Sequence, residues 1–93
     1  MREVARVAGG PAAAPLVQVA GSDACLRVAY EADAPIQAKL VDGAGRVLGG
    51  SGAPATEGVV AEEGPVCVRK GDSVVAVPEG QAAHVRWIAW EAP

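Results

Sequence analysis

The sequence predicts an all-β fold, a small β-sandwich of Ig-like or jelly-roll type with about eight short strands. Twelve glycines and seven prolines are spread over 93 residues, and they separate short runs of valine, alanine and leucine. Several of these runs alternate apolar and polar residues, which is the pattern of a half-buried strand. No run keeps the spacing of an amphipathic helix over three turns. Short strands with regularly spaced turn signals are typical of sandwiches and small barrels.

The clearest strand is Ala24–Glu31, where Leu26, Val28 and Tyr30 share one face. Asp42-Gly43-Ala44-Gly45 is a hairpin signal, because Asp-Gly supplies the positive φ that tight turns need. The remaining strands are bounded by similar glycine, proline or aspartate turns. The predicted strands are Leu16–Ala20, Ala24–Glu31, Ile36–Val41, Arg46–Leu48, Val59–Glu62, Val66–Arg69, Ser73–Val77 and Ala83–Trp90.

The N-terminal segment differs from the rest of the chain. Gly9-Gly10-Pro11 and Pro15 exclude a long helix there. We therefore expect residues 1–15 to form an extended arm and residues 16–93 to form a single β-sandwich domain. An arm of this composition needs a neighbour to order it, so the arm is a candidate contact segment.

Composition and charge exclude several classes of protein. The net charge is -3, and the basic residues do not cluster with aromatic ones, so no nucleic-acid binding is expected. No apolar run approaches the roughly 20 residues of a membrane helix. The N-terminus lacks the apolar core of a signal peptide. We expect a protein that is cytoplasmic at synthesis or part of a virion.

The two cysteines, Cys25 and Cys67, permit one disulfide. Both lie on predicted strands, on the faces opposite the aliphatic stripes. The Ig pattern requires a tryptophan between the two cysteines in the sequence, and none is present. The Cys-x-x-Cys spacing that would indicate a metal site is also missing. Without a signal peptide we expect reduced thiols that behave as small apolar residues, with the disulfide as the alternative.

The sequence holds little catalytic equipment. His84 is the single histidine, and no nucleophile motif places a serine, cysteine or carboxylate beside it. The acidic residues do not follow the spacing of a calcium loop, and the glycines do not precede a helix that could hold a phosphate. We expect no catalytic residue, no cofactor and no metal, and hence no enzyme.

The two tryptophans, Trp87 and Trp90, lie three residues apart on one predicted strand. Residues three apart on a strand face opposite sides, so one tryptophan fills the core and the other lies at the surface. Trp90 beside Arg86 has the composition of an interface hot spot. Carbohydrate-binding sandwiches present a stacking aromatic in a similar way.

We expect a non-enzymatic structural or assembly protein, such as a phage capsid decoration, cement or minor capsid component. The core is small and poor in large side chains, so a partner would compensate for what it lacks. The expected partners are proteins, in a homo-oligomer or a larger assembly such as a capsid. The alternative is a small ligand- or carbohydrate-binding accessory module. The expected contact residues are Val4, Val7, Leu16, Arg86 and Trp90.

Overall fold

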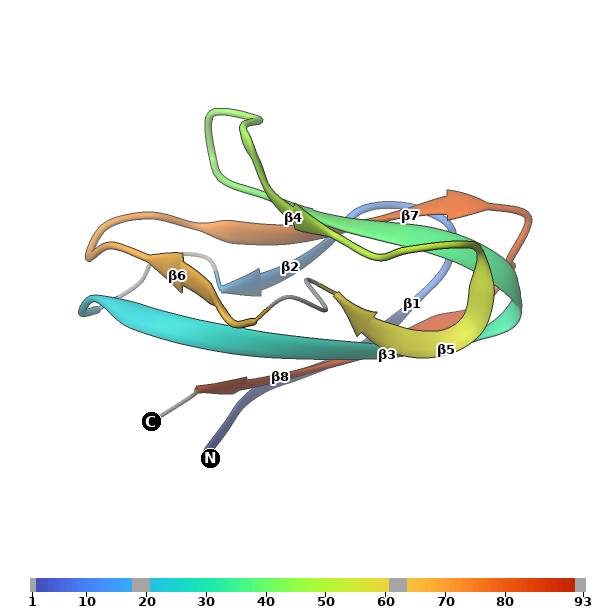
Figure 1. Cartoon of the computed structure of the whole chain (residues 1–93), viewed down its shortest axis with the longest axis horizontal. Helices are drawn as coiled ribbons and strands as arrows, with labels where there is room; N and C mark the ends of the chain where they lie inside the picture. Colours follow the sequence, from blue (N-terminus) through green and yellow to red (C-terminus); the bar gives the residue numbers. More distant parts are fainter. Residues whose placement is uncertain (1, 18–20, 61–63, 92–93) are drawn as a thin grey trace.

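The computed structural model describes residues 2–17, 21–60 and 64–91, and these residues form an all-β fold (Figure 1). They contain no helix, and so no helix that could span a membrane. Every recorded strand pairing is antiparallel. The strands are β1 (Arg2–Gly9), β2 (Ala14–Val17), β3 (Ala24–Val41), β4 (Val47–Gly50), β5 (Ala55–Val60), β6 (Val66–Val68), β7 (Val74–Gly80) and β8 (Val85–Glu91).

Strand β3 runs through both layers of the molecule. Its first half pairs with β8 along one edge and with β5 and β6 along the other. Its second half pairs with β7 along one edge and with β4 along the other. In Figure 1 the strand turns from the lower layer into the upper one between these halves. The result is one antiparallel sheet folded on itself, close to a barrel in shape, as the sandwich prediction required.

The bend in β3 falls at Asp33-Ala34-Pro35, where the sequence indicated a break between two strands. The two predicted strands are instead one, because the chain bends here without leaving the sheet. The Asp33 carboxylate fixes the bend by accepting hydrogen bonds from the backbone N–H groups of Ala83 and His84, at 2.9 and 3.2 Å. The register with β5 shifts between Glu31 and Ile36, so the proline, which has no N–H group, disturbs no regular ladder.

Within the expected N-terminal arm, residues 1–15, Arg2–Gly9 form strand β1 and Ala14 begins strand β2. Strand β1 pairs with β8 from Arg2 opposite Glu91 to Gly9 opposite Val85. Alternation in β1 is weak, because its inward side chains are the small Ala5 and the half-buried Val7. The sequence of this segment therefore shows almost no apolar stripe. The segment is held by its pairing with β8 of the same chain. The predicted ends at residues 18–20 and 61–62 lie outside the described residues.

The core lies between the two layers and is built by alternation along each strand. Leu26, Val28 and Tyr30 in the first half of β3 are buried, as the sequence predicted. Trp87 is the largest fully buried side chain, and its ring lies 5.9 Å from that of Tyr30. The other buried apolar residues are Ala14, Leu16, Ile36, Ala38, Leu40, Val60, Val66, Val68, Val74, Ala76, Ala82, Val85 and Ala89.

Candidate contact surface

The side chains that β8 turns away from the core define one outward face of the molecule. Trp87 and its inward neighbours are buried, whereas Arg86 is exposed and Ile88 and Trp90 are half-buried. The register places residues of β1 and β3 beside them on the same side. We call this surface the outer face; its residues are Glu3, Arg6, Ala8, Arg27, Ala29, Glu31, Val59, Arg86, Ile88 and Trp90.

An apolar row crosses the outer face. Ile88 on β8 lies opposite Ala29 on β3, and Ala29 lies opposite Val59 on β5. Val59 is 39% exposed, one of the few large apolar side chains that reach solvent. Trp90 lies two residues further along β8 on the same face, between Arg27 of β3 and Glu3 of β1. The row and the tryptophan together form a continuous apolar surface over three strands.

Charged side chains border this apolar row. Arg86 donates a hydrogen bond to Glu31, its cross-strand neighbour on β3. Arg6 donates to Glu3, with 2.7 Å between Arg6 Nη2 and Glu3 Oε1. On a regular strand, residues three apart face opposite sides. A bulge between Glu3 and Ala5 inserts Val4 into the strand and so brings Glu3 and Arg6 onto one face.

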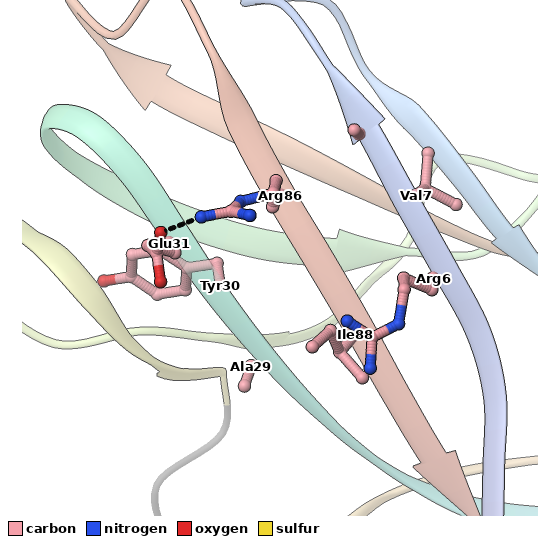
Figure 2. A pocket seen from close by; sticks show the side chains of 8 residues that line it. Arg6, Val7, Ala29, Tyr30, Glu31, Arg86 and Ile88 are labelled. Carbon is pink, nitrogen blue, oxygen red and sulfur yellow. Dashed lines mark hydrogen bonds and ion pairs between the residues drawn. The ribbon is translucent and has the colours of Figure 1, made fainter.

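A shallow groove lies between the two arginines (Figure 2). Ala29 and Ile88 line its floor, and Arg6 and Arg86 reach over it from β1 and β8. Its volume is about 510 Å³. The groove combines an apolar floor with charged sides. It therefore suits an apolar group with hydrogen-bond donors or acceptors at its periphery.

The structure separates the five predicted contact residues. Arg86 and Trp90 lie on the outer face, and Val4 is 37% exposed at the bulge beside it. Val7 is half-buried on the inward side of the same edge strand. Leu16 is only 7% exposed and packs in the core of the chain, so the structure does not place it on the outer face. It faces inward from β2 because the strand alternates there.

Cys25 and Cys67 lie opposite each other on β3 and β6 and form a disulfide, with 2.03 Å between the sulfur atoms. The structure therefore contains the disulfide, which was the alternative, and not the expected reduced thiols. Both cysteines point away from the core, as predicted, and Cys67 is exposed. Each cysteine is flanked by apolar residues that face the core. This alternation marks both segments as strands, but the pairing that brings the two cysteines together is a long-range property that alternation does not indicate.

His84 is exposed just before β8, and its backbone closes the bend of β3. Its N–H donates to Asp33 Oδ1, and its carbonyl oxygen accepts from the Asp33 N–H at 3.2 Å. Asp33 thus has a structural task in this position. Among the described residues no group of three or more histidine, cysteine or acidic side chains is placed to hold a metal ion.

Comparison with known proteins yields only distant structural similarity. No family model matches the chain, and no curated protein matches it. Among solved structures it is similar to a glycoside hydrolase family 43 arabinoxylan arabinofuranohydrolase from Bacillus subtilis, in complex with cellotetraose, with 13% identity and a TM-score of 0.47. That similarity covers 99% of this chain and 20% of the hydrolase chain. At this distance it supports no statement about function.

Proposed function

We propose that the chain is a non-enzymatic assembly protein that acts through protein–protein contacts made by the outer face. The observation that carries this proposal is the apolar row beside the half-buried Trp90, bordered by Arg27 and Arg86. Tryptophan and arginine are enriched in the energetic centres of protein interfaces. The virion setting expected from the sequence stays a prediction within this proposal.

The ion pairs around the apolar row support the same role. Exposed ion pairs such as Arg6–Glu3 and Arg86–Glu31 contribute little to folding, because water screens them. They place charged groups of both signs beside the apolar row. A polar rim around an apolar centre is the usual composition of a protein interface.

The test is the solution mass of the chain by multi-angle light scattering, with Ile88→Lys and Trp90→Ala as outer-face variants. Each should shift the protein to a smaller mass than the wild type, because each removes apolar contact area. Val47→Lys is the matched control, since Val47 is 59% exposed on β4 in the other layer. Unchanged masses for both outer-face variants, at concentrations where the wild type assembles, would refute the proposal.

The groove favours one alternative, a ligand- or carbohydrate-binding accessory module. Its volume of about 510 Å³ lies within the range of small-molecule sites, roughly 300 to 1,000 Å³. Tyr30 lines the groove but is only 5% exposed and packs in the core, so its ring offers little stacking surface. Trp90 lies on the same outer face, beside the groove rather than in its lining, and is the candidate platform. Glycan-array binding that Trp90→Ala abolishes, by a chain that stays monomeric, would favour this alternative.

A further inference from the structure

Strand β1 is an edge of the sheet. In the described part of the chain its recorded ladder partner is β8, and it stands at the end of the strand order. The backbone of an edge strand offers unpaired N–H and C=O groups to another strand. An eight-residue edge is long for a molecule of this size. Whether it can bind another strand depends on the features that protect it against such pairing.

Protection is confined to the first part of β1. The bulge at Val4 and the charged Arg2 and Glu3 are the features that natural edges use against pairing. From Ala5 to Gly9 the strand keeps a regular register with β8 and carries one charged side chain, Arg6. Ala5 and Val7 pack against the core from this edge but remain partly exposed. Strand β2 lies close to β1, but within the described residues β1 forms a ladder with β8 alone, so the other edge of this segment has no strand partner.

We propose that the segment Ala5–Gly9 pairs antiparallel with the same segment of a second copy, about a twofold axis at Val7. This rests on the proposed assembly function and names its partner. A twofold axis at Arg6 would set two arginines against each other, and like charges directly opposite are unfavourable. An axis at Ala8 would leave three residues to pair. An axis nearer the N-terminus would meet the bulge.

The Val7 register has no such conflict. It sets Val7 against Val7, Arg6 against Ala8, and Ala5 against Gly9 of the second copy. The two valines would cover the partly open core at both edges, because each lies on the inward side of its strand. The pairing also joins the outer faces of two copies into one continuous surface, since β1 is the border strand of both.

The pairing predicts a charge-rescue experiment. Residue 7 faces itself across the axis, so Val7→Lys and Val7→Glu should each weaken the dimer at least tenfold in sedimentation equilibrium. An equimolar mixture of the two should restore it, because a lysine then faces a glutamate. Val47→Lys, with the same change on an edge strand of the other layer, should sediment as the wild type does. Far-UV circular dichroism and urea titration report whether each variant is folded, because Trp87 lies opposite Val7 on β8 and its fluorescence would respond to the new charge itself.

A second pair of variants keeps the test decisive if residue 7 does not tolerate charge. Ala8 is exposed and would face Arg6 of the second copy. Ala8→Glu should tighten the dimer, and Ala8→Arg should loosen it.

Three results would overturn the pairing: a wild-type chain that stays monomeric, Val7→Lys and Ala8→Arg chains that dimerise normally, or a Lys/Glu mixture that does not recover. Ile88→Lys separates this proposal from the previous one. It should leave the edge dimer intact and remove only larger species. If the variants at residues 7 and 8 change dimerisation while Ile88→Lys has no effect on the mass, the outer-face contact is refuted and the pairing at β1 is retained.

Discussion

At the scale of single residues, the core depends on Trp87. Its indole is fully buried among aliphatic and alanine side chains and packs on Tyr30. Gly58 makes room for this pair, because a Cβ atom there would lie 3.0 Å from the Tyr30 hydroxyl oxygen. Within the described residues, Trp87 Nε1 is a buried donor without a hydrogen-bond partner. The chain keeps the indole despite this cost, which indicates that its volume matters most.

Replacing each of the two tryptophans with alanine should therefore lower the free energy of unfolding by different amounts. Trp87→Ala is expected to lower the free energy of unfolding by about 3 to 5 kcal/mol, because it leaves a large cavity. Trp90→Ala removes a half-buried side chain and should cost less than about half of that. Urea titration of both variants measures the difference. Equal losses would show that Trp90 belongs to the core and that the outer face is misplaced.

Asp42 organises the hairpin between β3 and β4. Its Oδ1 accepts hydrogen bonds from the N–H groups of Ala44 and Arg46, at 3.0 and 2.9 Å. Its Oδ2 pairs with Arg46 Nε at 3.1 Å. The positive φ that the turn needs belongs to Gly45, at 85°. The backbone hydrogen bond from Arg46, more than any other interaction, holds the pKa of Asp42 below its ordinary value of 3.8.

This lowered pKa predicts a pH dependence of stability. A carboxyl group whose pKa is lower in the folded state stabilises the fold fully above its unfolded pKa. That stabilisation is lost as the pH falls below about 3.8 toward the folded pKa. Thermal melts of the wild type and Asp42→Asn between pH 6 and about pH 2 check this. The wild type should lose more stability on acidification than the variant, and parallel curves would contradict the role of Asp42.

At the scale of elements, the smallest strand is attached by a covalent bond. Strand β6 has three residues. Within the described part of the chain, it pairs only with the start of β3. Its Val66 and Val68 are buried, so its loss would open the core. The Cys25–Cys67 disulfide, at a sequence separation of 42, therefore fixes an element whose own hydrogen bonds are few.

Reduction should destabilise the protein by about 2 to 4 kcal/mol, the usual effect of a disulfide that closes a long loop. Urea titrations with and without dithiothreitol measure this loss. The Cys25→Ser/Cys67→Ser double variant should match the reduced wild type and should not respond to dithiothreitol. Identical midpoints for the reduced and oxidised wild type would show that β6 is held by packing alone.

The elements also show what the sequence could predict. Alternation at Leu26, Val28 and Tyr30 is strong, because those side chains fill the core, and the strand there was predicted. Strand β1 was missed, because Ala5 and Val7 are small and give no contrast with their neighbours. The continuity of β3 through Pro35 was also missed. Local turn signals mark a bend and a break in the same way, and only pairing with β5, β7 and β8 distinguishes them.

At the scale of the whole molecule, the same comparison applies to the candidate surface. Arg86 and Trp90 were predicted from strand alternation, which is a local property. The groove could not be predicted, because it needs Arg6 beside Ile88, and these meet only when β1 pairs with β8. Under the two proposals, each copy has two contact surfaces: the β1 edge for a dimer and the outer face for larger species.

The most direct measurement is sedimentation equilibrium of the wild type, Val7→Lys, Val7→Glu and their equimolar mixture, from micromolar concentration upward. The account predicts an associating wild type, two variants that have lost the β1 dimer, and a mixture that recovers it. A wild-type chain that remains monomeric over the whole range would contradict assembly between copies of this chain, and with it the pairing at β1.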